Sequence, residues 1–205
     1  MIKKNLLALL LICSVLVSFA QDEEEEKRGF RKDNMFTGGS ISLSFFNNTF
    51  LIGANPVLGY RIAGWLDGGI VVNYQYSTSK DPNYGDKLNQ SFYGGGVFTR
   101  IYPIHFLFAT AQFEHNFLHY KYTYGNGGPV DENHTSGNSM LVGGGYASGR
   151  QANGNTPFFY MCLLFDISGN TNSPYTDQFG KSIPIIRAGF NIPLFQGKGG
   201  GGGDY

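Results

Sequence analysis

Residues 65–77 read WLDGGIVVNYQYS, and their pattern indicates the fold class. Apolar residues tend to occupy every second position, with glycine and polar residues mostly between them. The first set is Leu66, Ile70, Val72, Tyr74 and Tyr76, and the second is Asp67, Gly69, Val71, Asn73 and Gln75. A repeat of two residues is typical of a β-strand with one apolar face. The stretch is longer than the usual strand of a globular protein and matches a tilted strand that crosses a membrane.

Seven more segments follow the same pattern. They are residues 35–46, 49–62, 90–102, 105–122, 139–148, 157–168 and 182–195. One face of these segments is apolar, and the other mixes glycine, small polar residues and charges. A soluble barrel would have its apolar face inside and its charges outside. Here the apolar face holds almost no charge, which suits lipid, where a charge costs about 2–4 kcal/mol at the midplane.

The sequence therefore predicts an all-β fold, a transmembrane antiparallel up-and-down β-barrel of eight strands. Closure is required because an open sheet edge in hydrocarbon would leave backbone groups without hydrogen-bond partners. Eight strands leave an interior that side chains fill, so we expect a side-chain-filled interior and no open channel.

The connections between the segments support this topology. Residues 63–64 and 103–104 are tight connections, whereas residues 78–89, 123–138 and 169–181 are long and polar. Outer-membrane barrels alternate short periplasmic turns with long extracellular loops in this way. An even strand number then leaves both termini in the periplasm, and the three long segments are the expected contacts with an extracellular ligand.

The two ends of the chain differ from its middle. Residues 1–20 have the layout of a secretory signal peptide, with two lysines, a short apolar run and small residues before Gln21. Residues 21–34 are dense in charge and predict a solvated periplasmic segment, residues 35–196 form the barrel, and residues 197–205 form a glycine-rich flexible tail. The formal net charge of the whole chain is zero, so nothing indicates binding to nucleic acid.

Six charged side chains are expected to point into the barrel: Arg61, Asp67, Arg100, Glu114, Asp166 and Arg187. Arg61 and Asp67 flank the first tight turn and predict a cross-strand ion pair. Asp166 and Arg187 fall on adjacent strands, slightly out of register. We interpret the set as a structural network, because buried charges must be paired. The alternative is a gated ion path or a catalytic cluster.

Aromatic residues near the segment ends suit the belts at the two membrane interfaces. This set is Tyr60, Tyr74, Tyr76, Tyr93, Phe117 and Phe195. His115 and His119 are four residues apart on one face of the fifth segment, but no local motif completes a catalytic triad or a metal site with them. We therefore expect no catalytic residues, no metal and no cofactor.

Several motifs resemble a known family. They are GGSISLSF at 38–45, NPVLGYRI at 55–62, WLDGGIVVNYQYS at 65–77, FYGGGVFTRIY at 92–102 and IIRAGFNIPLF at 185–195. Together with the leader they look like the small outer-membrane β-barrel domain family of Bacteroidetes-type bacteria, which is broadly OmpA- and OmpX-like. The resemblance implies the fold and an outer-membrane location rather than an activity. Such barrels often end on an aromatic residue that the barrel-assembly machinery recognises, whereas here a glycine tail follows Phe195.

These observations favour a non-enzymatic outer-membrane barrel with an envelope role or with loops that recognise a partner at the surface. Two alternatives stay open: an enzyme that modifies lipid A, or the barrel of a secretion or assembly machine whose residues 21–34 meet a periplasmic partner. The expected partners are outer-membrane lipid and lipopolysaccharide, and the barrel-assembly machinery during insertion.

Overall fold

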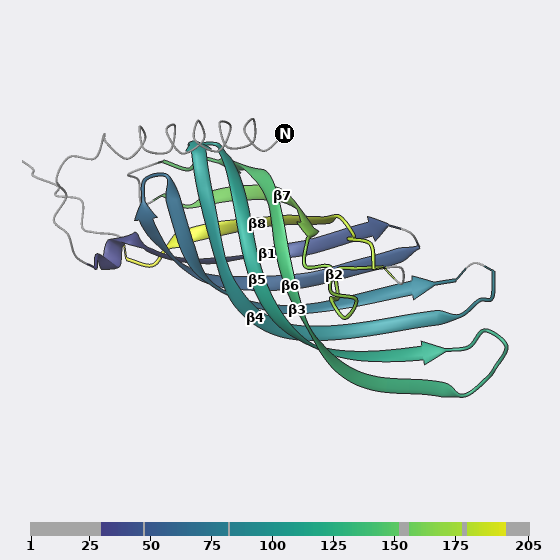
Figure 1. Cartoon of the computed structure of the whole chain (residues 1–205). Helices are drawn as coiled ribbons and strands as arrows, with labels where there is room; N and C mark the ends of the chain where they lie inside the picture. Colours follow the sequence, from purple (N-terminus) through teal and green to yellow (C-terminus); the bar gives the residue numbers. More distant parts are fainter. Residues whose placement is uncertain (1–29, 47, 82, 152–155, 178–179, 196–205) are drawn as a thin grey trace, which may run out of the picture. The chain divides into compact units, whose positions relative to one another are not determined.

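The chain folds into a closed barrel of eight antiparallel strands (Figure 1). The computed structural model describes residues 30–46, 48–81, 83–151, 156–177 and 180–195. A short 3₁₀ helix, η1 (Lys32–Asn34), precedes β1 (Met35–Phe46), β2 (Thr49–Ala63), β3 (Leu66–Lys80), β4 (Lys87–Ile104), β5 (Leu107–Thr123), β6 (Val130–Ser148), β7 (Phe158–Asp166) and β8 (Ile185–Pro193). Each strand pairs with its neighbours in sequence, and β8 pairs with β1, so the predicted up-and-down topology is confirmed.

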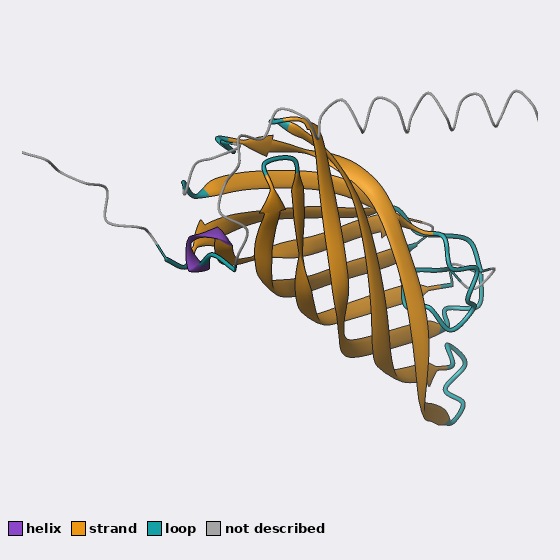
Figure 2. Ribbon diagram, turned by 60° about the vertical axis from the view of Figure 1, so that its left-hand side comes forward, coloured by secondary structure: helices purple, strands orange, loops and turns teal. Residues whose placement is uncertain are grey.

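The two ends of the barrel are built differently (Figure 2). The end that we call the turn end holds Gly64–Trp65, His105–Phe106 and both ends of the described barrel, where the Leu194 amide donates to the Met35 carbonyl. The opposite end, the loop end, holds residues 81–86, 124–129 and 167–184. Asn48 makes the two-residue turn between β1 and β2 in a left-handed conformation, with φ of 58°, which asparagine tolerates better than most residues.

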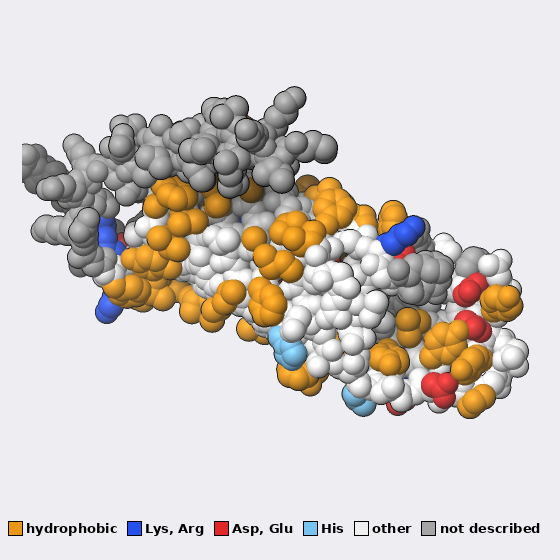
Figure 3. All heavy atoms as spheres, in the orientation of Figure 1, with side chains coloured by type: hydrophobic (Ala, Val, Ile, Leu, Met, Phe, Trp, Pro, Cys, Tyr) orange, Lys and Arg blue, Asp and Glu red, His pale blue; other side chains and the backbone are white. Residues whose placement is uncertain are grey.

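Strand alternation separates an apolar outer wall from a polar and aromatic interior. On β1, Ile41 is 61% exposed, whereas the next residue, Ser42, is fully buried. The same alternation runs along the whole of β7, where every second side chain is exposed. Figure 3 shows hydrophobic side chains along the barrel wall and acidic side chains near the loop end. The face that the sequence assigned to lipid is therefore the outer face.

The interior is filled by side chains, as predicted. Two apolar clusters pack inside, one of them made of Phe36, Val57, Val71 and Phe98. The cavity between Arg100 and Arg187 has a volume of only about 10 Å³, the space of roughly one water molecule. Glycine permits close strand contact here, because a Cβ on Gly96 would lie 1.8 Å from the Phe113 carbonyl oxygen.

Several strand boundaries differ from the sequence prediction. β6 begins at Val130 rather than at residue 139, β4 begins at Lys87 rather than at 90, and β8 covers only Ile185–Pro193 rather than 182–195. The second tight turn is His105–Phe106 rather than residues 103–104. The early start of β6 was missed because residues 131–138 carry no apolar side chain on either face, so no apolar repeat marks them, although the backbone ladder with β5 continues.

The predicted signal peptide (1–20), most of the charged segment 21–34 and the tail 197–205 lie outside the described residues. Among the residues that the structure describes, no helix has the length and apolar character needed to span a membrane.

Candidate functional site

Glu114 on β5 is the centre of the polar network inside the barrel. Its side chain is fully buried. One carboxylate oxygen accepts from Gln112 Nε2 at 2.5 Å and from an Arg187 guanidinium nitrogen at 3.1 Å. The other accepts from Asn73 at 2.6 Å and from Asn116 at 3.1 Å. Such a set of donors, one of them a full charge, is what a carboxylate needs in order to stay buried.

The loop of residues 167–184 adds a further donor that the sequence analysis missed. Tyr175 in this loop is fully buried. Its hydroxyl donates to Glu114 Oε2 at 2.6 Å and accepts from Gln75 Nε2 at 2.7 Å. Its ring meets the ring of Phe92 edge-on, with centroids 5.6 Å apart. The loop therefore plugs the barrel from the loop end, and no local sequence pattern marked Tyr175 as the residue that enters the barrel.

A second buried ion pair lies nearer the turn end. Asp67 on β3 is 3.2 Å from a guanidinium nitrogen of Arg150, and both side chains are almost completely buried. The Arg150 guanidinium also stacks on the Tyr102 ring, 3.5 Å from its centroid. Arg100 lies close by over the Tyr160 ring at 4.1 Å. Cation–π contacts of this kind contribute stabilisation where a charge is desolvated.

The structure places the six predicted interior charges as follows. Asp67, Arg100, Glu114, Asp166 and Arg187 are buried, and Arg61 is half-buried. Arg61 lies opposite Asp67 in the strand register, as expected, while the ion pair described for Asp67 goes to Arg150 in the connection after β6.

The expected proximity of Asp166 and Arg187 does not give an ion pair. Arg187 pairs with Glu114. Asp166 accepts from the Met140 and Ser168 amides and from the Ser173 hydroxyl. The reason is register: β7 pairs with β8 only as far as Leu164↔Ile185, so Asp166 lies beyond the shared ladder and meets the loop.

Four of the predicted interface aromatics lie where the outer wall changes from apolar to polar. Tyr74, Tyr93 and Phe117 are register partners across β3, β4 and β5 and form one row, with Tyr76 one outward position further along β3. On β5 the outward residues beyond this row are polar, for example Lys121 and His119. Tyr60 and Phe195 lie at the turn end.

His119 and His134 lie on the outer face beyond that row, whereas His115 lies one outward position before it and His105 lies in the turn between β4 and β5. His119 stacks on His134 with ring centroids 4.4 Å apart, and its Nε2 is 4.0 Å from Glu132. His115 contacts Asn138 at 2.7 Å. In the described part of the chain, no group of three or more His, Cys, Asp or Glu side chains is arranged to hold a metal ion.

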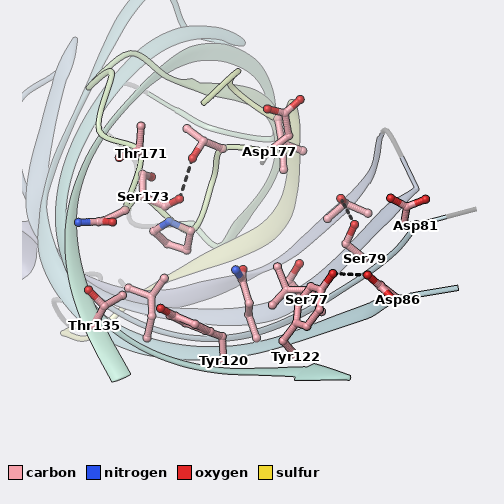
Figure 4. Close-up of a pocket in the computed structure, with 18 of the residues that line it drawn as sticks. Ser77, Ser79, Asp81, Asp86, Tyr120, Tyr122, Thr135, Thr171, Ser173 and Asp177 are labelled. Carbon is pink, nitrogen blue, oxygen red and sulfur yellow. Dashed lines mark hydrogen bonds between the residues drawn. The ribbon is translucent and has the colours of Figure 1, made fainter. Parts of the chain in front are cut away.

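A cup at the loop end is the candidate binding site. Strands β3 to β6 extend past the rest of the barrel there and form a curved wall (Figure 1), and residues 171–177 lie opposite it (Figure 4). The cavity between them has a volume of about 590 Å³. It is lined by Thr49, Ser77, Ser79, Asp81, Asp86, Leu88, Gln90, Leu118, Tyr120, Tyr122, Tyr124, Asp131, Thr135, Thr171, Asn172, Ser173, Pro174, Thr176, Asp177 and Ile183.

Two tyrosine–aspartate contacts organise the rim of this cup. The Tyr122 hydroxyl donates to Asp86 Oδ2 at 2.5 Å, and the Gly125 amide donates to Asp86 Oδ1 at 2.9 Å. The backbone donor, with Tyr122, lowers the pKa of Asp86, and the bond to Asp86 raises the pKa of Tyr122 to about 12. The Tyr124 hydroxyl donates to Asp131 at 3.0 Å. The hydrogen bond to Asp131 likewise raises the pKa of Tyr124, so Asp86 is held as an anion and the two tyrosines as neutral donors at neutral pH.

The fold and the site together define a closed, plugged eight-stranded barrel with an apolar outer wall and a polar cup at one end. No protein-family model matches the chain, and no curated protein matches it. Among solved structures it is similar to Ail, the attachment invasion locus protein of Yersinia pestis, at 8% identity, with 77% of this chain and 94% of that chain covered and a TM-score of 0.44.

Two other solved structures are also similar. The N-terminal β-barrel domain of Pseudomonas aeruginosa OprF matches at 11% identity over 78% of this chain and 98% of that chain, with a TM-score of 0.44. Neisserial surface protein A matches at 16% identity over 78% and 96%, with a TM-score of 0.40. The fold assignment depends on the strand pairing of this chain itself, which agrees with an OmpA- and OmpX-like barrel. None of these similarities supports the resemblance to a family of Bacteroidetes-type bacteria.

Proposed function

We propose that the protein is a non-enzymatic outer-membrane barrel that binds a small ligand in the cup at its loop end, facing the outside of the cell. One observation carries this proposal. The barrel is sealed at Glu114, Arg187 and Tyr175, while a ligand-sized cavity opens directly above the seal. A closed interior with an accessible cavity at one end suits binding at the surface better than passage through the wall.

The outer wall supports the placement in a membrane. Along β3, β4 and β5, the outward side chains from the turn end to the row of Tyr74, Tyr93 and Phe117 are mainly apolar, and beyond Tyr76 they are polar or charged. A band of this kind, ending in an aromatic row, is the pattern of a membrane barrel. Lipid and lipopolysaccharide would then contact the wall, and the barrel-assembly machinery would insert it.

The orientation follows from the two ends of the barrel. Outer-membrane barrels keep short turns in the periplasm and long loops outside. With Gly64–Trp65 and His105–Phe106 in the periplasm, the cup faces the cell exterior and the described chain begins and ends in the periplasm.

Labelling of intact cells tests the orientation. Thr171→Cys places a thiol on an exposed residue of the cup, and His105→Cys places one on an exposed turn-end residue. The unmutated protein is the blank, because Cys162 is buried. A membrane-impermeant maleimide is expected to label the Thr171→Cys protein in intact cells and the His105→Cys protein only after permeabilisation. The reverse result would refute the orientation.

Two measurements on purified protein test the closed barrel. Protein extracted from outer membranes is expected to migrate differently on a gel before and after boiling. In planar bilayers it is expected to give no large, stable openings, because the interior is filled. Stable conductance of the unmutated protein would show that the plug leaves the barrel, and the closed-barrel proposal would be wrong.

A further inference from the structure

The wall of the cup separates charges between its two faces. On the outer face of the extension, Lys121 pairs with Glu132 at 3.0 Å, and both side chains are about half exposed. On the inner face, Tyr120, Tyr122 and Asp131 line the cup. No Lys, Arg or His belongs to the described lining. Because side chains alternate along a strand, Lys80, Lys87 and Lys121 point away from the cup.

The carboxylates of the cup differ from those inside the barrel. Asp67 and Glu114 each have an arginine as an ion-pair partner. Asp86 and Asp131, in contrast, accept hydrogen bonds from neutral hydroxyl or amide groups. Asp81 likewise accepts from the amide of Asn83 at 2.7 Å. Among the described residues none of these three carboxylates has a cation within ion-pair distance, so their negative charge is not compensated locally.

The tyrosine rings of the cup add a second attraction for a positively charged ligand. Tyr120, Tyr122 and Tyr124 line one side of the cup, and the last two are held in an edge-on contact with ring centroids 4.8 Å apart. The hydroxyl of Tyr122 donates to Asp86 and that of Tyr124 donates to Asp131, so these bonds fix the positions of the two rings. An aromatic face attracts an ammonium or guanidinium group. Rings and carboxylates in one cavity therefore favour a positively charged ligand.

The size and spacing of the site restrict the ligand further. The volume of about 590 Å³ is in the range of small-molecule sites and excludes a folded protein as the occupant. The acidic groups of the described residues are not gathered tightly enough for a single metal ion. Separated carboxylates on a tyrosine-lined wall instead match a flexible chain that carries several separated charges.

We propose that the cup binds a small organic polycation, a linear amine with two or more ammonium groups that lie against Asp81, Asp86 and Asp131 and over the tyrosine rings. The inference depends on the cup being a ligand site, as proposed above, and it adds the chemical class of the ligand.

Binding of spermidine to the full-length protein, refolded in detergent, tests the proposal by calorimetry. Saturable binding with one site is expected. Asp131→Asn retains an oxygen that accepts from Tyr124 and removes the charge, and it is expected to weaken spermidine binding by about tenfold, the loss of one close charge pair. Asp86→Asn is expected to do the same. Glu132→Gln is the matched control, because it removes the same charge one residue away on the outer face, and its effect is expected to stay within about twofold.

The outcomes separate this inference from the proposed function. Equal losses of spermidine affinity in Asp131→Asn and Glu132→Gln would mean that spermidine binds only through the overall negative charge of the surface, and the inference would be wrong. Binding of the neutral sugar maltose without binding of spermidine would also overturn the cationic class, while the cup would remain a ligand site. Heat-modifiable migration of each variant shows that its barrel has formed, and if one aspartate variant fails to form, the other decides the result.

Discussion

Replacing Tyr175 with phenylalanine removes one hydroxyl from the centre of the barrel and leaves the ring in place. The hydroxyl donates to the fully buried carboxylate of Glu114 at 2.6 Å and accepts from Gln75 at 2.7 Å. Because the acceptor is the carboxylate that also pairs with Arg187, the lost bond is a charge-assisted one. Tyr175→Phe therefore tests whether the loop plug contributes to barrel stability.

The expected cost follows from the bonds that are lost and kept. A hydrogen bond to a charged group contributes about 1.5–3 kcal/mol. Gln75 Nε2 keeps its other acceptor, Asn55 Oδ1 at 3.1 Å, so no large second penalty arises from an unsatisfied donor. Glu114 likewise keeps its bonds to Asn73 and Arg187. We expect Tyr175→Phe to lower the free energy of unfolding by about 2–3 kcal/mol.

Tyr102→Phe is the matched control. Tyr102 is buried inside the same barrel, but its hydroxyl has no hydrogen-bond partner among the described residues. Removing a buried hydroxyl that makes no hydrogen bond is expected to be neutral or slightly stabilising. The assay is urea unfolding of protein refolded in lipid vesicles, followed by the fluorescence of Trp65 and by heat-modifiable migration. Equal stabilities of the two variants, within about 0.5 kcal/mol, would refute the reasoning that the Tyr175 hydroxyl is held by Glu114.

Three further predictions concern the charges and the wall. Glu114→Gln leaves Arg187 buried without its carboxylate, and it is expected to cost about 3–5 kcal/mol in the same urea assay; a cost below about 1 kcal/mol would show that the pair is not what keeps Arg187 buried. Val72→Lys places a charge on the apolar outer wall and is expected to cost about 2–4 kcal/mol in lipid vesicles, and an unchanged stability would contradict the assignment of that face to lipid. The bond between Asp86 and Tyr122 makes stability depend on pH in two ranges. The contribution of Asp86 is present above the ordinary aspartate pKa and is lost as the pH falls through the lowered pKa of Asp86 in the folded protein. The contribution of Tyr122 is present below about pH 10 and is lost as the pH rises through about 12. In an ultraviolet titration, Asp86→Asn is expected to lower the pKa of Tyr122 toward its ordinary value, and an unchanged pKa would show that the bond between them is not the cause.

The candidate site was only partly predictable from sequence. Residues 78–89, 123–138 and 169–181 were expected to present a ligand surface, and the cup draws its lining in part from all three. Much of the first two ranges is strand rather than loop, so Asp131 and Thr135 stand on a rigid wall. The insertion of Tyr175 was not predictable, because its partners Glu114 and Gln75 are far away in sequence and no local pattern links them.

The interior ion pairs were likewise only partly predictable from sequence. The sequence correctly placed Glu114 and Arg187 on inward faces, since the alternation of two is a local property of a strand. It did not show that they pair with each other, and it gave no role to Arg150, the partner of Asp67. Pairing across a closed barrel depends on the stagger of all eight strands and on the connections between them, and these are not encoded in any one segment.

The number of strands, their order and the outward face of each could be derived from the residues of the chain alone. These follow from local periodicity and from the requirement that every backbone group in a membrane finds a partner, which forces closure. The return of a loop into the barrel, and the cup that the unequal extension of β3 to β6 leaves beside that loop, emerged only from the folded chain. The physical reason is that both features depend on contacts between residues that only the closed ring brings together.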